Sequence, residues 1–428
     1  MTTAQDTRLR DLSVRLLQRV LPEHRRFHVQ LWDGTVLPAP QDHSATLVIN
    51  STESLGQMLQ TPVDVAVGEA YMNGAFDIQG DVLAVFEAIE DIVPRLSALE
   101  WATLAQEAAA LRKAAGLGSP LAAVLKGRQH SRSRDMEAVQ YHYDVSNRFY
   151  QLWLDPRMVY SCAYFPTGQE TLEQAQTAKL DLICRKLRLK PGERLLDIGS
   201  GWGGLALYAA RQYGVQVVGV TLSQQQLQEA RERAARQGLE GQVEFRLQDY
   251  RDVSGEFDKV VSVGMSEHVG AEQLGTYFQL AWQRLRPGGL MLNHAISSGP
   301  VALDTAPSVA TGQFVQRYIF PDGEILPIWQ TLRDAQNAGF EVRDVEDLRE
   351  HYARTLTCWL RNLEAHWTEA ETEVGLSRLR LWRLYLAGSA HQFDWGHLAI
   401  HQALLAKPAA HGRVELPASR ADLYRSAP

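Results

Sequence analysis

The residues best suited to chemistry form a glycine-rich turn that follows an apolar segment. Residues 195–198 read Leu-Leu-Asp-Ile, and Gly199, Gly201 and Gly204 follow with G-x-G-x-x-G spacing. Glycine lets the backbone bend sharply and lets a ligand approach closely. A helix that begins there offers unpaired N–H groups to polar ligand atoms. Several cofactor classes share this spacing, so it predicts a nucleotide-like cofactor without saying which one.

Acidic residues near the turn distinguish between these cofactor classes. A dinucleotide site places a carboxylate about 20 residues beyond the glycines, where it binds the ribose hydroxyls, but Thr221 stands there. Asp197 instead precedes the glycines, and Asp249 ends a later strand. This arrangement resembles S-adenosylmethionine-dependent methyltransferases, in which a carboxylate complements the cationic cofactor and the second acidic position commonly meets the adenine. The alternative role for both carboxylates is to cap helices or turns.

The chain around the turn alternates between strand and helix patterns. This order indicates an α/β fold with a mostly parallel sheet and helices on both faces. The resemblance to methyltransferases implies that this fold is of their Rossmann-like type. Ligands bind outside the carboxyl ends of the strands in such sheets. The expected strands are 194–198, 216–221, 243–247, 259–263 and 290–296, and the expected helices are 203–213, 224–237 and 274–285.

The rest of the sequence indicates how the chain divides into domains, a linker and a tail. Residues 1–125 are expected to form an α+β domain, 126–140 a linker, 141–406 the catalytic domain, helical and aromatic beyond residue 347, and 407–428 a loose tail. The first helix could lie on a membrane surface or cover the core of its own domain. The basic stretch 126–134 could be solvated or could touch anionic headgroups. In the first domain we expect strands at 27–32 and 45–49 and helices at 54–59, 65–72 and 82–93.

Composition excludes several classes of protein. The 428 residues carry a formal net charge of -7, which argues against general nucleic-acid binding. Cys162, Cys184 and Cys358 form no C-x-x-C pair, so we expect a reducing compartment, no disulfide framework and no metal site. The first residues lack the apolar core of a signal peptide, and no run reaches the ~18 apolar residues of a membrane span. We therefore expect a soluble, cytoplasmic protein.

Further motifs resemble one branch of the methyltransferases, the cyclopropane-fatty-acid synthases and the related mycolic-acid methyltransferases. Their order and spacing agree from Tyr141 to at least Tyr352. Residues 68–74 and 77–81 also resemble the lipid-handling N-terminal domain of bacterial synthases. The motifs are His142-Tyr143-Asp144, Tyr160-Ser161-Cys162-Ala163-Tyr164, Gly199 to Gly204, Thr221-Leu222-Ser223, residues 264–270 (Gly-Met-Ser-Glu-His-Val-Gly), His294-Ala295-Ile296, Tyr318-Ile319-Phe320-Pro321 and Tyr352.

The resemblance implies transfer of a methylene from S-adenosylmethionine across the cis double bond of a phospholipid acyl chain. After methyl transfer, a base must remove a proton from the new methyl so that the ring can close. In this family the base is a bicarbonate ion, and Glu267 must either accept the proton of that ion or carry one itself. The residues that would hold it are Cys162, Glu267, His294, the backbone at Ile296, and Tyr352. Each also has a structural alternative: a buried thiol, a helix cap, a core histidine or a packed ring.

The same resemblance assigns residues to the cofactor and to the substrate. Tyr318 and Ser266 are expected beside the acyl chain, and Ser266 stands where relatives often carry a larger apolar residue. Because Glu267 is present, ring formation is favoured over a methyl-branched product. A lipid-binding protein with a degenerate catalytic domain is the alternative outside enzymes. The expected cofactor-binding residues are Tyr160, Ser161, Asp197, Gly199, Gly201, Trp202, Gly203, Thr221, Leu222, Gln226, Asp249 and Tyr250.

The implied substrate lies in a bilayer, which sets the expected partners. We expect transient docking of a peripheral protein at the inner membrane surface, through the N-terminal domain and the basic stretch 126–134. The resemblance also suggests a homodimer, in which a second docking surface would add avidity.

Overall fold

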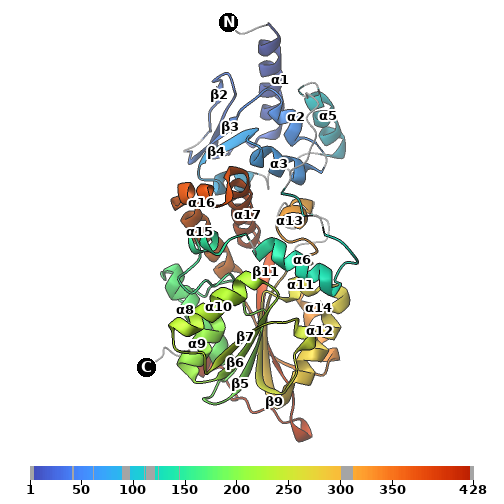
Figure 1. The fold of residues 1–428 in the computed structure, drawn as a ribbon. Helices are drawn as coiled ribbons and strands as arrows, with labels where there is room; N and C mark the ends of the chain where they lie inside the picture. Colours follow the sequence, from blue (N-terminus) through green and yellow to red (C-terminus); the bar gives the residue numbers. More distant parts are fainter. Residues whose placement is uncertain are drawn as a thin grey trace. The chain divides into compact units, whose positions relative to one another are not determined.

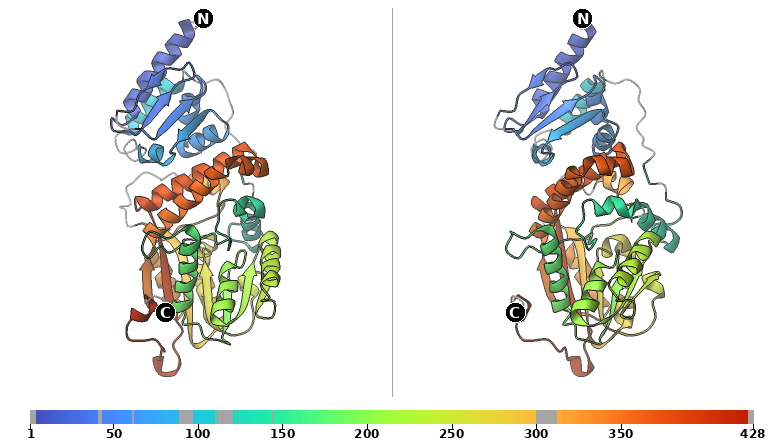
Figure 2. Two further views of the ribbon diagram at one scale, coloured as in Figure 1. Left: turned by 90° about the vertical axis from the view of Figure 1, so that its left-hand side faces the viewer. Right: turned by 60° about the vertical axis from the view of Figure 1, so that its left-hand side comes forward.

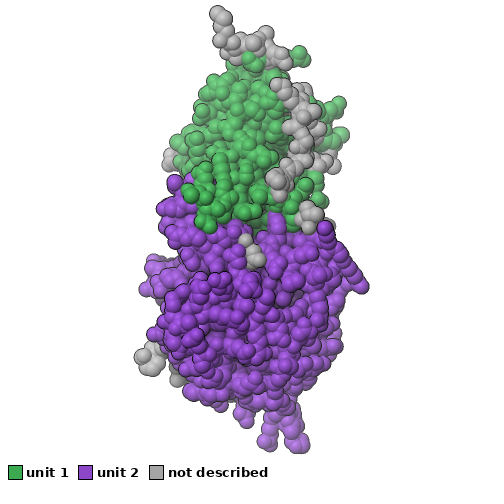
Figure 3. Space-filling model, in the orientation of Figure 1, with its two compact units in different colours: residues 1–123, 302–319, 370–392 green, residues 124–301, 320–369, 393–428 purple. Residues whose placement is uncertain are grey.

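Two units divide the chain between them in the computed structural model, and Figure 3 shows them in different colours. Unit 1 comprises residues 1–123, 302–319 and 370–392, and unit 2 comprises residues 124–301, 320–369 and 393–428. The described residues are 4–40, 43–60, 62–88, 97–109, 111, 121–123, 125–143, 145–299 and 312–424. Within these ranges no helix is both long and apolar enough to cross a membrane.

Unit 1 contains a small sheet with the strand order β2-β1-β3-β4. β1 pairs parallel with β3, whereas β2 and β4 are antiparallel to their neighbours. Alternate side chains of β1 and β3 are buried, as expected for strands with one face against a core. The strands are β1 (Phe27–Gln30), β2 (Val36–Leu37), β3 (Ala45–Ile49) and β4 (Phe76–Gly80). The helices are α1 (Ala4–Val20), α2 (Ser54–Met58), α3 (Val63–Met72), α5 (Ala98–Ala109), α13 (Gln313–Tyr318) and most of α17 (Leu376–Asp394).

The expected elements of the N-terminal domain can be compared with this unit. Of the expected helix 82–93, residues 83–88 are helical, residue 82 precedes the helix as a bend, and residues 89–93 lie outside the described residues. In α1, Leu16 and Leu17 are buried, so these two side chains belong to the core of their own unit. Arg383 of α17 donates to the Tyr71 hydroxyl and to the Ile78 carbonyl, both at 2.8 Å. A helix from the expected catalytic domain therefore completes unit 1.

Unit 2 is built on a seven-stranded sheet with the order β10-β11-β9-β8-β5-β6-β7. β9, β8, β5, β6 and β7 run parallel, and β11 pairs antiparallel with both β9 and β10. The expected mostly parallel sheet is confirmed. Its strands are β5 (Arg194–Ile198), β6 (Gln216–Thr221), β7 (Val243–Leu247), β8 (Phe257–Val263), β9 (Leu285–Ser298), β10 (Glu341–Asp347) and β11 (Leu398–Ala406).

Helices cover both faces of this sheet, as Figures 1 and 2 show. Apolar side chains of α8, α9 and α10 form one core with the sheet, and those of α12 and α14 form the other. α15 packs on β11, and its first turn approaches the sheet where Leu348 donates to the Ile400 carbonyl. The helices are α6 (Arg132–Tyr143), α7 (Asn147–Gln151), α8 (Leu172–Lys186), α9 (Gly204–Tyr213), α10 (Gln224–Arg236), α11 (Ser266–Val269), α12 (Ala271–Arg284), α14 (Ile328–Asn337) and α15 (Arg349–Ala365), with 3-10 turns η1 (Tyr250–Asp252), η2 (Ala410–Gly412) and η3 (Ala421–Leu423). Most of the next helix, α16 (Trp367–Val374), belongs to unit 1.

Three segments differ from the expectations. Residues 398–406 form a strand where a helical pattern was expected, because the sheet offers an open edge beside β9 and this outweighs local propensity. Most of the expected linker 126–140 is helix α6. The expected loose tail is anchored in part, since Leu423 is buried and Arg420 pairs with Asp344 at 2.7 Å.

Candidate functional site

The glycine turn between β5 and α9 has the left-handed backbone that glycine permits. Gly199, Gly201 and Gly203 have φ values of 80°, 54° and 83°. At Gly199 a Cβ would lie 2.5 Å from Met265 Cγ, so the approach is too close for any side chain. The backbone N–H groups of Gly199 and Ser200 both donate to the Val220 carbonyl at 3.0 Å. The turn is therefore fixed to β6, and α9 begins directly beyond it.

A cavity opens above this turn, at the carboxyl ends of the parallel strands. Every expected cofactor-binding residue lines it except Gly203 and Asp249. Gly203 permits close packing, because a Cβ there would lie 2.6 Å from the Phe245 ring, and its expected contact with the cofactor stays a prediction. Residues that the sequence analysis did not assign to the cofactor also line the cavity: Val139, Tyr143, Met158, Lys179, Gln248, Met265 and His268 among them.

Hydrogen bonds hold the polar side chains of the cavity wall in place. The Thr221 hydroxyl donates to Gln226 Oε1 at 2.8 Å, and Ser223 caps α10 by accepting from the Gln226 N–H at 3.2 Å. The Trp202 indole N–H donates to Asn147 Oδ1 at 2.7 Å. These bonds pre-organise a wall with both apolar and polar groups, as a nucleoside ligand requires.

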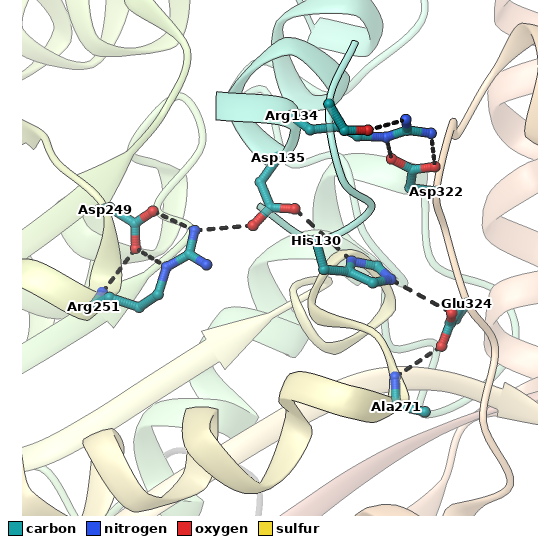
Figure 4. A network of polar contacts seen from close by, with 9 residues as sticks. His130, Arg134, Asp135, Asp249, Arg251, Ala271, Asp322 and Glu324 are labelled. Carbon is teal, nitrogen blue, oxygen red and sulfur yellow. Dashed lines mark hydrogen bonds and ion pairs between the residues drawn. The ribbon is translucent and has the colours of Figure 1, made fainter. Parts of the chain in front are cut away.

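Asp249 does not line the cavity in this structure, and its expected contact with the cofactor stays a prediction. Its carboxylate accepts from the Arg251 side chain at 2.8 Å and 2.6 Å, and the same guanidinium donates to Asp135 of α6 at 2.9 Å (Figure 4). The pKa of Asp249 is lowered by the hydrogen bonds from Arg251, which outweigh its burial. Asp249 therefore fixes Arg251 and, through it, the helix α6.

Further polar contacts hold α6 and the residues just before it in place. The His130 ring lies between Asp135, at 3.8 Å, and Glu324, at 3.5 Å (Figure 4). Arg134 donates to Asp322 Oδ1 at 2.8 Å. Since α6 supplies Val139 and Tyr143 to the cavity lining, this polar network positions part of the cavity wall.

Two buried charged groups also line the cavity. Asp197 is 2% exposed, and its Oδ2 has no hydrogen-bond partner among the described residues. Burial raises the pKa of Asp197 to about 7, although Lys179 opposes this shift. Lys179 is 1% exposed and donates to Ser161 Oγ at 2.7 Å, and burial lowers its pKa to about 8.

Lys179 was not identified from the sequence, although a signal was present. It stands four residues after Ala175 and three before Leu182, both fully buried on α8. Residues at these spacings share one face of a helix. A lysine on a buried face is uncommon unless it is paired or has a function.

Three of the expected catalytic residues lie near the end of β9. The Ile296 N–H donates to Glu267 Oε1 at 2.7 Å. His294 lies two residues before Ile296 on β9 and so shares its face of the strand. Gln402 Nε2 contacts His294 Nδ1 at 3.3 Å, and Glu267 Oε2 and His294 Nε2 are buried without partners among the described residues.

The protonation of these groups follows from their burial. Burial raises the pKa of Glu267 to about 7, and the Ile296 N–H partly offsets this. The pKa of His294 lies well below its ordinary value because of burial and the nearby Lys179. The imidazole is therefore neutral at neutral pH. With its Nδ1 facing the Gln402 amide, the ring carries its proton on Nε2.

The other two expected catalytic residues lie at α15. Cys162 Sγ donates to the Ala163 carbonyl at 3.1 Å and more weakly to the Leu348 carbonyl at 3.7 Å. The backbone N–H of Tyr352 donates to the same Leu348 carbonyl. The Tyr352 ring packs on the Phe393 ring, with 4.6 Å between the two ring centroids. Leu348 also bonds to Ile400, which pairs with Ile296 in the sheet. The five residues are thus connected around the end of β9.

The two expected substrate residues have other contacts. The Ser266 hydroxyl donates to Asn293 Oδ1 at 3.0 Å and is buried, so it anchors α11. Tyr318 belongs to unit 1, where its hydroxyl donates to the buried Glu69 carboxylate. Arg317 approaches the same carboxylate at 3.5 Å.

Comparisons with known proteins agree on the class of enzyme. A sequence model described as mycolic acid cyclopropane synthetase matches residues 130–403. The chain belongs to this family. The "Probable fatty acid methyltransferase" of Pseudomonas putida is 41% identical over 405 residues, which cover 94% of this chain and 97% of that protein. The cyclopropane-fatty-acyl-phospholipid synthase of Escherichia coli (strain K12) is 40% identical over 271 residues, 63% of this chain and 68% of that one.

A solved structure of the mycolic acid cyclopropane synthetase family links the cavity to its cofactor. Mycolic acid cyclopropane synthase CmaA1, complexed with SAH and CTAB, matches with a TM-score of 0.61 and 35% identity over 64% of this chain and 98% of that one. The protein is thus an S-adenosylmethionine-dependent transferase, in a family that forms cyclopropanes or transfers methyl groups on lipid acyl chains. A model of a domain of unknown function matches residues 16–92.

Proposed function

We propose that the protein transfers the methyl carbon of S-adenosylmethionine to the cis double bond of an unsaturated acyl chain in a membrane phospholipid, and then closes a cyclopropane ring. The cavity over the glycine turn would hold the cofactor, with Asp197 facing its cationic groups and Thr221 and Gln226 in the wall. The name of the Escherichia coli relative supports the phospholipid substrate and the ring product.

The observation that carries the proposal is the pair of unpartnered polar atoms at the end of β9. Glu267 Oε2 and His294 Nε2 are buried, and neither has a hydrogen-bond partner among the described residues. A buried polar group without a partner costs free energy unless a ligand satisfies it. A neutral imidazole N–H and a carboxyl group with a pKa of about 7 suit a small oxyanion that carries a proton.

We infer that this oxyanion is bicarbonate, held by Glu267, His294, the Ile296 backbone, Cys162 and Tyr352. When bound, it supplies a base close to the reacting carbons. Glu267 Oε1 is committed to the Ile296 N–H, so Oε2 is the oxygen that can take or give a proton. Burial raises the pKa of Cys162 above its ordinary range, which keeps the thiol protonated and weakly polar.

The chemistry that these residues must support has two bond-forming stages. The alkene π electrons form a bond to the sulfonium methyl, while the electrons of the broken carbon–sulfur bond stay on sulfur. A proton then leaves the added methyl, and its bonding electrons close the ring. Water must be kept from the cationic carbon between these stages, so a buried site is needed. The buried walls around β9 meet this need.

A second candidate function ends in a methyl-branched acyl chain without a ring. The Pseudomonas putida relative, which matches nearly the whole chain, carries the name of a fatty acid methyltransferase and supports this alternative. Both candidates share the cofactor and the methyl-transfer stage, and they differ in the fate of the cation.

The substrate lies in a bilayer, so we propose transient docking at the inner membrane surface. Arg15 of α1 is exposed and supplies basic charge in unit 1 for anionic headgroups, and Arg10, which pairs with Asp11, would add to it by exchanging that partner. We further propose that residues 1–125 handle lipid and that a homodimer adds avidity. Binding to anionic and neutral vesicles, with and without an Arg10→Glu/Arg15→Glu double variant, tests the docking.

The activity is tested with purified protein, vesicles of a cis-unsaturated phospholipid and labelled S-adenosylmethionine. We expect a lipid that is heavier by one CH2 unit, and Glu267→Ala should abolish its formation while lipid binding remains. Glu272→Ala is the matched control, because Glu272 is an exposed carboxylate on neighbouring α12. If the wild-type protein forms no heavier lipid, the proposal is wrong.

A further inference from the structure

Lys179 is a buried cation that the residues assigned so far leave without an ionic partner. Its ammonium is almost fully buried, and Ser161 Oγ, at 2.7 Å, is its hydrogen-bond acceptor. Among the described residues no carboxylate oxygen lies within 4.0 Å of its Nζ, the distance of an ion pair. A buried ammonium without a counter-ion is strongly disfavoured, so a bound anion would stabilise Lys179.

The position of Lys179 shows where that anion would lie. Lys179 and Ser161 both line the cofactor cavity, next to Asp197 and the glycine turn. Among the described residues that line the cavity, Lys179 is the one lysine or arginine and Asp197 the one carboxylate. Asp197 Oδ2 is also buried without a partner in the described part of the chain. The cavity thus offers one buried cation and one buried anion that do not pair with each other.

These two groups complement an amino acid zwitterion. S-adenosylmethionine ends in a methionyl group that carries an ammonium and a carboxylate on one carbon. We propose that Lys179, together with the Ser161 hydroxyl, binds the carboxylate of that methionyl group and so fixes the direction of the sulfonium methyl. This inference rests on the use of S-adenosylmethionine and is independent of whether the lipid product carries a ring or a branch.

The electrostatic surroundings of Lys179 agree with this role. The carboxylates of Asp155 and Asp197 act to raise the pKa of Lys179, and the charge of Lys179 in turn lowers the pKa of His294. Burial nevertheless lowers the pKa of Lys179 to about 8, so these groups do not compensate for the lost hydration. A bound carboxylate would restore the charged form, so ligand affinity should fall as the pH rises above this value.

The test compares S-adenosylhomocysteine with its decarboxylated analogue, which keeps the adenosine, the sulfur and the amine. Isothermal titration calorimetry gives the affinity of each ligand for the wild-type protein and for Lys179→Met. We expect the wild type to prefer the carboxylate-bearing ligand by roughly 10- to 100-fold, the range of a hydrogen bond to a charged group. Lys179→Met should lose this preference while binding of the analogue stays within about 3-fold.

Lys186 provides a matched control on the same helix. It is also a fully buried lysine, but it pairs with Glu346 and does not line the cavity. Lys186→Met should therefore keep the preference, even where it lowers stability. Lys179→Arg, which retains the charge, should keep part of it.

Several outcomes would overturn the inference. The inference fails if Lys179→Met weakens the binding of both ligands equally, or of neither. It also fails if Lys186→Met abolishes the preference for the carboxylate-bearing ligand. If Lys179→Met does not fold, the pH dependence of the wild type decides. Affinity for S-adenosylhomocysteine must then fall above about pH 8 relative to the analogue, and a parallel pH dependence of both ligands refutes the role. Failure of lipid modification with normal ligand preference would contradict the proposed function alone.

Discussion

The backbone N–H of Ile296 donates to Glu267 Oε1 at 2.7 Å, and the other oxygen of the same carboxylate is buried without a partner among the described residues. One oxygen therefore holds α11 against the end of β9, and the other is available for chemistry. The Glu267 residue is partly exposed although this oxygen is buried. Burial of the carboxylate raises its pKa to about 7.

The raised pKa of Glu267 predicts a pH-dependent gain in stability for Glu267→Gln. The folded protein holds the proton more tightly than the unfolded chain, so stability is lost as the pH rises from the ordinary pKa of 4.5 to about 7. The glutamine keeps the acceptor for the Ile296 N–H and does not titrate. We expect it to raise the free energy of unfolding by about 2 kcal/mol near pH 8 and to change it little near pH 5.

Urea denaturation at several pH values measures this difference. Glu272→Gln, at an exposed position on α12, serves as the control and should show no such trend. If the free energies of unfolding of Glu267→Gln and of the wild type differ by the same amount at every pH, the carboxylate is not desolvated.

The polar network in Figure 4 predicts that α6 loosens when Asp135 is replaced. Asp135→Ala removes the 2.9 Å contact with Arg251 and the contact with His130. We expect faster amide hydrogen exchange over residues 132–143 and an affinity for S-adenosylhomocysteine lower by roughly 3- to 10-fold. Arg132→Ala breaks only an exposed pair with Asp252, so neither quantity should change. Unchanged exchange in Asp135→Ala would show that the network does not hold the helix.

The glycine turn predicts different costs at neighbouring positions. At Gly201 a Cβ meets nothing within 4 Å, so Gly201→Ala carries only the strain of a positive φ, about 1 kcal/mol. Since Gly201 lines the cavity, the variant should fold and bind S-adenosylhomocysteine less well. Gly203→Ala adds a 2.6 Å clash with Phe245 and should cost ~2–4 kcal/mol. Equal denaturation midpoints for the two variants would contradict this assignment of roles.

Cysteine reactivity tests the state of the Cys162 thiol. Burial raises the pKa of both Cys162 and Cys184, so neither presents a thiolate at neutral pH. In the native protein we expect iodoacetamide to modify the less buried Cys358 first, and the other two only after unfolding. Peptide mass mapping measures the order. Rapid native modification of Cys162 would indicate a nucleophilic cysteine and would conflict with its place as a neutral hydrogen-bond donor.

The sequence predicted the central part of the fold well because local patterns and tertiary needs agree there. The bounds of β5, β6 and β7 match the expected strands, since β5 and β6 are mainly apolar runs and β7 alternates apolar and charged residues. β11 was missed because Leu398–Ala406 is rich in alanine and leucine, which favour helices in isolation. Only pairing with β9 and β10 makes this segment a strand.

The candidate site was predictable to a similar extent. The glycine turn and the motif residues around it do line one cavity. The assignment of Asp249 to the cofactor stays a prediction, and the sequence did not show that Arg251, two residues on, donates to its carboxylate. Lys179 was overlooked because lysine in an amphipathic helix ordinarily lies on the exposed face. The burial of Lys179 depends on packing between distant segments, which a single sequence does not display.

The central claim is that the transferred carbon becomes part of a ring. The most direct test is carbon-13 NMR of the phospholipid recovered after incubation with S-adenosylmethionine labelled in its methyl group. Deprotonation assisted by Glu267 and His294 predicts that the label appears as an upfield CH2 of a cyclopropane. A labelled CH3 on the acyl chain, or no label in the lipid, would contradict the account.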